Sequence, residues 1–274
     1  MERTPQLEWL ARTGYAARGI VFLILGYFTA LAAIGTHTRP VDTKEALRAL
    51  LSAPFGGLLL SLLAAGLVCF AVWRCAQSVF DADGCGTDLK GLSRRAVYGA
   101  TSLFYAGFAL VALLVIVGSA TGSTDQAVRD WTAWLLAKPL GRWMVGAAGV
   151  AVAATGLGTG IAGIRAEFAR RLALKERPRL LVTVLGSVGY LTRAFVFTIV
   201  GLFLVFAALD SNAHEAKGLA GTLLVVKTLP YGAVLLGVAA IGLLAFGAFG
   251  IAEAAFRRIK KGAYGTTGLS WLRA

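Results

Sequence analysis

Charged side chains are scarce in this chain: aspartate, glutamate, lysine and arginine together make up 15% of its 274 residues. An average soluble domain carries about 25% of such residues. Hydrophobic residues make up 57% of the chain, and the mean hydropathy is +0.73. So little charge argues against a water-soluble globule and indicates an integral membrane protein.

The residues that most often carry chemistry are also few. The chain has two histidines and three cysteines: His37, His214, Cys69, Cys75 and Cys85. No Ser-His-Asp or Cys-His arrangement, HExxH motif or P-loop is present, and the glycines of Gly156–Gly160 lie inside an apolar run, where we expect them to pack helices. We therefore predict no catalytic residue, no cofactor and no metal site, and we expect that the protein is not an enzyme.

One acidic stretch resembles a calcium-binding loop in composition, the run DADGCGTD at Asp81–Asp88. An EF-hand loop that starts at Asp81 requires glutamate at its twelfth position, where this chain has Leu92. Zinc is not favoured either, because no histidine lies near Cys75 and Cys85. We interpret the run as a turn-rich connector.

Long apolar runs are abundant by contrast. Crossing about 30 Å of hydrocarbon takes about 20 apolar residues in a helix, and six candidate spans approach that length. They are Gly19–Ile34, Phe55–Trp73, Ala96–Gly118, Trp143–Ile164, Ala194–Leu209 and Tyr231–Ala252. Little chain is left over, so we predict a single transmembrane domain, residues 1–274, with no sizeable soluble part.

The net charge of +13 is concentrated on one side of these spans. The two termini and the loops after the second and fourth spans, with the span ends that adjoin them, hold 19 of the 27 lysines and arginines. This bias indicates a multi-pass protein with both termini in the cytoplasm. Such residues ordinarily bind anionic headgroups, so the expected partners are membrane lipids and an unidentified solute or protein, and not nucleic acid.

The chain also repeats itself. Gly14–Gly26 and Gly189–Gly201 are identical at seven of thirteen positions, and a weaker copy surrounds Tyr98. Each copy leads, 39 to 41 residues after its tyrosine, to a Pro-x-Gly turn. The prolines and glycines of these turns are Pro54 and Gly56, Pro139 and Gly141, and Pro230 and Gly232. The spacing predicts three tandem two-helix repeats, residues 12–80, 95–165 and 187–256.

These repeats predict an all-α, integral membrane six-helix bundle with pseudo-three-fold symmetry, because an even number of crossings returns each copy to the same side. The segments Asp42–Ser52, Asp125–Leu136 and Glu215–Val226 are expected to form short outer helices at the interface. We place each proline in the first turn of the following span. The glycine- and alanine-rich second span of each repeat is expected in a tight inner ring.

Polar residues near the cytoplasmic ends of the spans form a candidate polar layer: Tyr15, Arg18, Gln77, Tyr98, Thr101, Tyr190, Arg193 and Glu253. The two arginines and Thr101 occupy equivalent places. Arginines at this depth either extend to the lipid headgroups or form a basic layer that faces an anionic solute or lipid. Thr101 leaves such a layer incomplete.

The tyrosines recur in every copy, either as interfacial anchors or as a hydrogen-bonding ring with Gln77 and Glu253. Glu253 is the single acid near a span interior, and an intramembrane acid requires a partner. We expect Arg193 as that partner. The pair is then either a structural ion pair or part of a proton-coupled device.

Three features together resemble one family: the run RTGYAARGIVF at Arg12–Phe22, the connector DADGCGTDLKG at Asp81–Gly91, and the Pro-Phe-Gly turn in a three-hairpin layout. It is the bacterial membrane family catalogued as domain of unknown function 1206. The resemblance covers nearly the whole chain and implies a six-span, three-repeat protein of the bacterial cytoplasmic membrane. It implies no activity, substrate or catalytic residue. Leu140 and Ser187 depart from the repeat pattern and make the copies unequal.

Two functions remain open from the sequence. The duplicated intramembrane arginine favours a small transporter or channel for an ion or small solute along the pseudo-three-fold axis. The scarcity of polar residues at mid-span favours a non-catalytic structural or accessory protein that binds lipid or a partner. Transport sites require polar groups or broken helices at mid-membrane, so the interior of the bundle distinguishes the two.

Overall fold

The computed structural model describes residues 5–35, 42–119, 122–166, 168–169, 172 and 176–257. In these residues the long helices are α1 (Pro5–Ala33), α3 (Gly56–Val79), α4 (Leu89–Ile116), α6 (Gly141–Ile164), α7 (Glu176–Leu209) and α9 (Gly232–Phe256). Each contains an apolar stretch long enough to cross a membrane. The predicted all-α fold with six spans in three tandem repeats is therefore confirmed.

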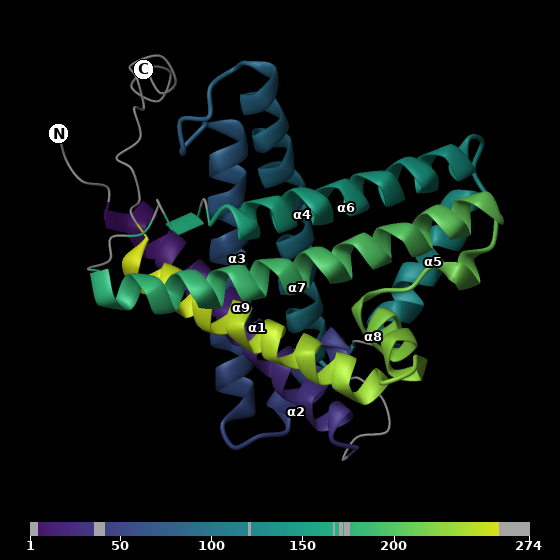
Figure 1. Ribbon diagram of the computed structural model, residues 1–274, viewed down its shortest axis with the longest axis horizontal. Helices are drawn as coiled ribbons and strands as arrows, with labels where there is room; N and C mark the ends of the chain where they lie inside the picture. Colours follow the sequence, from purple (N-terminus) through teal and green to yellow (C-terminus); the bar gives the residue numbers. More distant parts are fainter. Residues whose placement is uncertain are drawn as a thin grey trace.

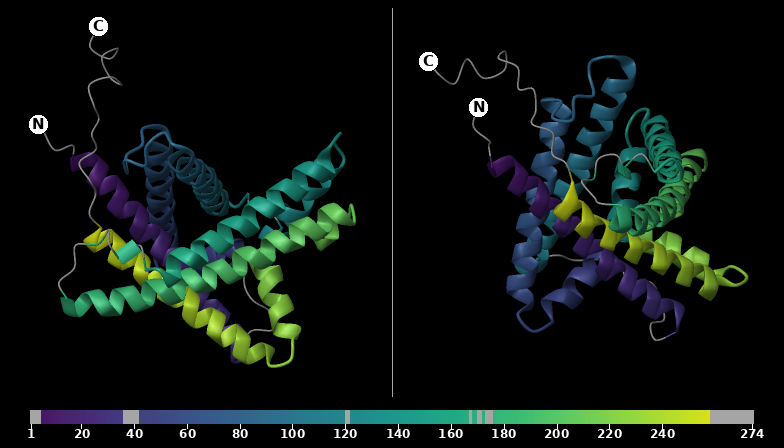
Figure 2. Two further views of the ribbon diagram at one scale, coloured as in Figure 1. Left: turned by 45° about the horizontal axis from the view of Figure 1, so that its top comes forward. Right: turned by 60° about the vertical axis from the view of Figure 1, so that its left-hand side comes forward.

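Short helices join the two spans of each repeat: α2 (Thr43–Leu51), α5 (Thr124–Leu136) and α8 (Leu219–Thr228), the last preceded by the 3₁₀ turn η2 (Ala213–Glu215). We call this side of the molecule the loop-helix end. The opposite side, the connector end, holds the start of α1, the α3–α4 and α6–α7 connections and the end of α9 (Figures 1 and 2). The described chain thus begins and finishes at the same end.

The principal helix pairs form between repeats rather than within them. The second span of each repeat packs along the first span of the next, as α3 with α4 and α6 with α7, and α9 returns to α1 (Figure 1). The three pairs share one register. Gly19 lies against Gly247 backbone, Ala194 against Gly156, and Ser102 Oγ donates to Ala71 O at 2.8 Å. Small residues at these crossings allow the close approach that lipid alone does not drive.

Repeat 2 breaks the symmetry. In repeats 1 and 3 the two spans of the hairpin also pack on each other, because Gly14 lies against Phe70 backbone and Gly189 against Phe246 backbone. The equivalent positions of repeat 2 hold Val97 and Thr155, and α4 and α6 run in different directions (Figures 1 and 2). The predicted pseudo-three-fold symmetry is therefore not confirmed for the whole bundle.

The prediction of an inner ring made from the second spans agrees with the burial of α3 and α9 but is wrong for α6. The apolar stretches of α1, α3 and α9 are 44%, 50% and 56% buried, whereas that of α6 is 17% buried. The reason is the divergence of repeat 2: α6 packs mainly on α7, while α1, α3 and α9 each have neighbours on two sides.

The Pro-x-Gly turns have a common geometry that differs from the predicted one. The proline precedes the span instead of lying in its first turn, and the helix starts at Gly56, Gly141 or Gly232. The middle residue adopts a left-handed conformation, with φ of 58° at Phe55 and 62° at Leu140. A Cβ on any of these glycines would collide with a carbonyl oxygen of the preceding short helix. The glycine therefore lets each short helix fold directly against its span.

At the connector end, the helix pairs share an equivalent capping contact. Arg12 Nη1 donates to the carbonyl oxygens of Ala254 and Ala255 at the end of α9, and Arg95 donates to those of Ser78 and Val79 at the end of α3. In the third pair the equivalent Ser187 donates to Gly163 O near the end of α6. The last carbonyls of a helix lack intrahelical donors, so each contact stabilises one junction between repeats.

Candidate functional site

A cluster of buried charges lies where the connector ends of α1, α3 and α9 meet. Arg18 Nη2 donates to Glu253 Oε2 at 2.6 Å, and the two side chains are 2% and 4% exposed. The other carboxylate oxygen, Oε1, accepts a hydrogen bond from Arg257 Nη1 at 2.8 Å. One carboxylate is thus shared by two guanidinium groups inside an apolar bundle.

The partner predicted for Glu253 was wrong. We expected Arg193 on α7, in the same hairpin as Glu253, but the acid pairs with Arg18 across the α9–α1 contact. Arg193 occupies on α7 the place that Arg18 has on α1, and its paired helix α6 has Ala162 where α9 has Glu253. The partner of Glu253 is therefore set by how helices of neighbouring repeats pack on each other, and not by the packing of the two spans within one hairpin.

The α3–α4 connector continues the network. Asp83 Oδ2 accepts hydrogen bonds from Gln77 Nε2 at 2.9 Å, from the Tyr98 hydroxyl at 3.1 Å and from Arg257 Nη2 at 3.5 Å. Gln77 Oε1 in turn accepts one from Arg74 Nη1 at 3.0 Å. A continuous polar chain therefore runs from Arg18 through Glu253 and Asp83 to Arg74.

The connector holds Asp83 in place through its own turns. Asp81, with φ of 51°, accepts hydrogen bonds from the backbone N–H groups of Cys85 and Gly86. Asp88 caps α4 by accepting one from Gly91 N–H. The interpretation as a turn-rich connector agrees with this geometry, but it missed the contribution of Asp83 to the cluster.

Aromatic rings lie next to the guanidinium groups. The Arg18 guanidinium carbon lies 5.4 Å from the centre of the Phe70 ring and 4.9 Å from that of Phe246. Arg74 lies 5.0 Å from Phe70, and Arg193 lies 5.4 Å from Phe246 and 4.6 Å from Phe197. Cations over ring faces are favourably placed, so these rings support charges that have no carboxylate.

The predicted tyrosines have different surroundings. Tyr15 is 1% exposed and packs edge-on against Phe70, so it is not an interfacial anchor. Tyr98 donates to Asp83, whereas Tyr190 stacks on Phe168 at 4.9 Å. Phe168 stands in repeat 2 where Asp83 stands in repeat 1, so an aromatic contact replaces a hydrogen bond.

Of the remaining predicted site residues, some belong to the charge cluster and others do not. Gln77, which is fully buried, belongs to the cluster. Thr101 Oγ1 donates to Val97 O of its own helix and contributes no described contact to the cluster. Arg18 does not extend to the headgroups, because only 2% of its side chain is exposed.

Sequence reasoning missed Arg74 and Arg257 as well as Asp83. Arg74 and Arg257 lie near the ends of second spans and enter the sequence analysis only through the charge bias of the cytoplasmic side, whereas Asp83 belongs to the run interpreted as a connector. One signal was available: Arg74 precedes Gln77 by three residues and Arg257 follows Glu253 by four, so each arginine lies on the same helix face as a candidate already chosen.

The cluster carries more positive than negative charge. Among the described residues it contains four guanidinium groups, Arg18, Arg74, Arg193 and Arg257, and two carboxylates, Asp83 and Glu253. The Nε atoms of Arg18, Arg74 and Arg193 are buried without an acceptor. An anion is the chemical group that this arrangement is able to hold.

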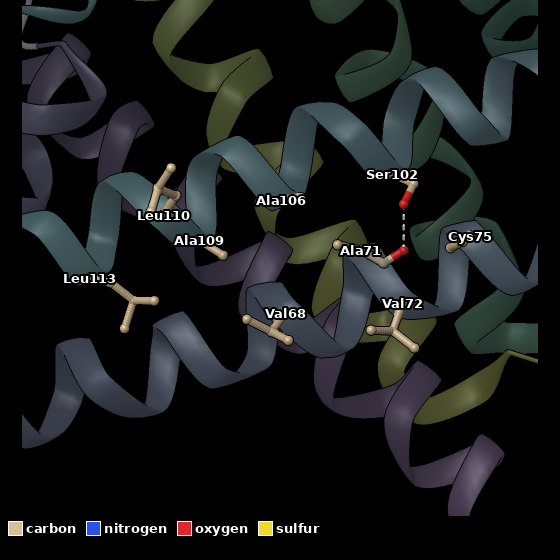
Figure 3. Close-up of a pocket in the computed structure, with 9 residues that line it drawn as sticks. All are labelled: Val68, Ala71, Val72, Cys75, Ser102, Ala106, Ala109, Leu110 and Leu113. Atoms are coloured by element: carbon tan, nitrogen blue, oxygen red, sulfur yellow. Dashed lines mark hydrogen bonds between the residues drawn. The ribbon is translucent and has the colours of Figure 1, made fainter.

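The centre of the bundle is filled at this level. Phe70, Tyr105, Phe246 and Phe249 are each at most 2% exposed. A cavity of about 330 Å³ does exist between α3 and α4 (Figure 3), but its walls are apolar apart from Ser102 and Cys75. Val68 and Val72 in its wall are 44% and 48% exposed, so it is a groove on the outer surface and not a polar passage.

Comparison with known proteins agrees with this architecture. Residues 13–81, 96–166 and 188–257 each match the family described as Domain of Unknown Function (DUF1206). The chain is 28% identical over 261 residues to the "Uncharacterized protein YxxB" of Bacillus subtilis (strain 168), which covers 94% of each chain. No solved structure matches the chain.

Proposed function

The chain belongs to the family of Domain of Unknown Function (DUF1206), and on that premise we propose that it is a non-catalytic accessory protein of the bacterial cytoplasmic membrane that binds anionic lipid at its cytoplasmic side. The connector end is the cytoplasmic side in this proposal, because the basic residues concentrate there. The observation that carries the proposal is the excess of arginines, two of them buried and two partly buried, over carboxylates at the ends of the spans.

The depth of the cluster supports a lipid. Arg18, Arg74 and Arg257 lie at or within a few turns of span ends, where the phosphates of a bilayer approach a protein. Lipids with anionic headgroups are attracted to such basic residues. The chain also offers an apolar surface for acyl chains, including the groove between α3 and α4 (Figure 3).

Transport along the central axis has less support. The residues around the axis at the level of the cluster are packed aromatic side chains, Phe70, Tyr105 and Phe246. The mid-span hydroxyls Thr155 and Thr159 donate to carbonyl oxygens of their own helix. Neither feature provides a polar route through the membrane.

The test uses the full chain in lipid nanodiscs made either of phosphatidylcholine alone or of phosphatidylcholine with phosphatidylglycerol. We expect a higher midpoint of thermal unfolding with phosphatidylglycerol, because a ligand that binds only the folded state stabilises it. Native mass spectrometry should find phosphatidylglycerol retained. Equal midpoints with no retained anionic lipid would contradict the proposal. An anion flux through proteoliposomes that requires Arg18 would instead favour transport.

A further inference from the structure

Two arginines of the cluster, Arg74 and Arg193, have no acid among the described residues, and the repeat pattern explains the absence at Arg193. In the α9–α1 pair Arg18 meets Glu253. The α6–α7 pair has the same register, since Ala194 lies against Gly156 as Gly19 lies against Gly247. The residue equivalent to Glu253 is Ala162. Arg193 therefore occupies an arginine position whose carboxylate partner is absent from the chain.

Among the described residues, no carboxylate pairs with Arg193 in compensation. Both oxygens of Glu253 are engaged, by Arg18 and by Arg257. In the described part of the chain Arg193 has only aromatic contacts, with Phe197 and Phe246, and its Nε atom is buried without an acceptor. The Arg193 side chain is partly exposed, and a charge that is partly removed from water gains from an accompanying counter-charge.

Two further guanidinium groups lie near Arg193. Arg18 shares the Phe246 ring with it, and Arg74 shares the Phe70 ring with Arg18. The charges of Arg18 and Arg74 both act on Arg193. These like charges repel each other, and an anion among them would turn that repulsion into attraction.

We propose that this site binds one phosphate group, which takes the place of the missing carboxylate and is held chiefly by Arg193 with Arg74 and Arg18. Guanidinium groups match the oxygens of phosphate with paired hydrogen bonds, and several cations suit a group that carries up to two negative charges. The proposal deepens the proposed function and rests on it only for the source of the phosphate, which is either a lipid headgroup or a soluble phosphate compound.

The experiment measures thermal unfolding of the full chain in neutral detergent at constant ionic strength. The probes are inorganic phosphate, with chloride as reference, and a short-chain phosphatidylglycerol, with short-chain phosphatidylcholine as reference. We expect the wild type to be stabilised by phosphate, by phosphatidylglycerol or by both. The Arg193→Gln variant should bind the active probe about tenfold or more weakly, the loss expected when charge-assisted hydrogen bonds are removed. Without a probe it should unfold at or above the wild-type midpoint, because it lacks an uncompensated charge.

Two further variants separate ligand binding from a structural role. Ala162→Glu supplies the absent carboxylate and should raise the midpoint without a probe while abolishing the response to it. Arg94→Gln, at an exposed position of the same end, should respond as the wild type does. An Arg193→Gln variant that responds like the wild type, or a wild type that responds to neither probe, would overturn the site.

The outcomes also distinguish this inference from the proposed function. If phosphatidylglycerol stabilises the wild type and Arg193→Gln equally, lipid binding stands and this site is wrong. If inorganic phosphate alone stabilises the wild type and Arg193→Gln abolishes the effect, the site stands and its ligand is a soluble phosphate, so the lipid-binding function fails.

Discussion

Glu253 joins two arginines of the buried cluster. Its carboxylate joins Arg18 of the first span to Arg257 at the end of the last helix. Pairs of this kind contribute little net stability compared with an apolar replacement, but removal of one partner leaves the other charged groups buried and uncompensated. Removing one partner of the pair is therefore expected to cost far more stability than replacing the whole pair with apolar residues.

The first prediction concerns Glu253→Gln. The change keeps the shape of the side chain but leaves Arg18 without a carboxylate and Arg257 with only its contact to Asp83 at 3.5 Å, so we expect a loss of about 3–5 kcal/mol in the free energy of unfolding. Thermal and denaturant unfolding in detergent provide the measurement. The matched control is Glu8→Gln, whose ion pair with Arg12 is partly exposed and should change stability by less than about 1 kcal/mol. Similar losses in both variants would refute the importance of the buried pair.

The sequence predicted several residues of the cluster correctly, but it did not predict which of them contact each other. Arg18, Gln77 and Glu253 were found because they recur at equivalent positions in copies of one pattern. Asp83 was missed because its place depends on how the α3–α4 connector turns back over α3, and a repeat comparison contains no information on that path. Thr101 was included only by equivalence, and its hydroxyl bonds to its own helix instead.

At the scale of helices, one glycine contact decides whether a hairpin closes. Gly14 and Gly189 let α1 and α7 approach the backbones of Phe70 and Phe246 in their own repeats. Repeat 2 has a valine and a threonine in these places, and its spans diverge. The sequence predicted three-fold symmetry because the tyrosines and the Pro-x-Gly turns recur in all three repeats. The residues at the contact between the two spans of a hairpin do not recur in repeat 2.

The second prediction tests that contact. In Gly189→Ala the new Cβ would lie 2.6 Å from the Phe246 Cα, so backbone must shift, and overpacking of this kind costs about 1–3 kcal/mol. In the control Gly107→Ala the Cβ would meet no atom within 4 Å, and the gain in helix propensity should leave stability unchanged or slightly raised. Unfolding midpoints of the two variants provide the comparison; a stable Gly189→Ala variant would show that α7 and α9 do not need this approach.

The short helices are linked in sequence order at the loop-helix end. Asp42 caps α2 and also accepts a hydrogen bond from Thr124 N–H at the start of α5. Asp125 of α5 accepts one from Gly218 N–H at the start of α8, at 3.0 Å. Each acid thus joins the short helix of its own repeat to that of the next.

The third prediction is a pH dependence. Burial raises the pKa of the Asp125 carboxyl above its ordinary value of 3.8; hydrogen bonds from Gly218 and Gly221 and the charge of Arg129 oppose this shift, and the charge of Asp42 adds to it. The folded state therefore holds the proton more tightly than the unfolded state. This group's contribution to stability is complete below pH 3.8 and is lost as the pH rises through the raised pKa.

The measurement compares wild type with Asp125→Asn, which keeps an acceptor for Gly218 N–H but cannot ionise. Unfolding midpoints are followed as the pH is lowered from neutral towards 3.8, the ordinary pKa of this carboxyl. We expect the wild type to gain stability relative to the variant as the pH falls. A constant difference across this range would contradict the assignment.

At the scale of the whole molecule, the connector end gathers both ends of the described chain and the charge cluster. Arg12 near the start of α1 contacts the end of α9, as an even number of spans requires. The number of spans and their grouping in three repeats followed from the sequence. The pairing between repeats did not, because equivalent hairpins allow either arrangement and only side-chain packing selects one.

The fourth prediction concerns orientation. If the connector end faces the cytoplasm, a membrane-impermeable maleimide will not label Cys85 in intact cells in a variant that has alanine at Cys69 and Cys75. The same reagent will label a chain without native cysteines that carries Gln126→Cys, since Gln126 is exposed at the loop-helix end. Permeabilised cells should give labelling of both. Labelling of Cys85 in intact cells would reverse the assignment of sides.

The α9–α1 contact has a consequence for biosynthesis. Arg18 precedes Glu253 by 235 residues, so the ribosome must make all of that intervening chain before the Arg18 side chain receives its acid. Throughout translation the newly inserted α1 carries an uncompensated charge at the edge of the bilayer. A nascent chain arrested before α9 should therefore be a preferred client of insertion chaperones and membrane proteases, and the arrival of the last helix should end that vulnerability.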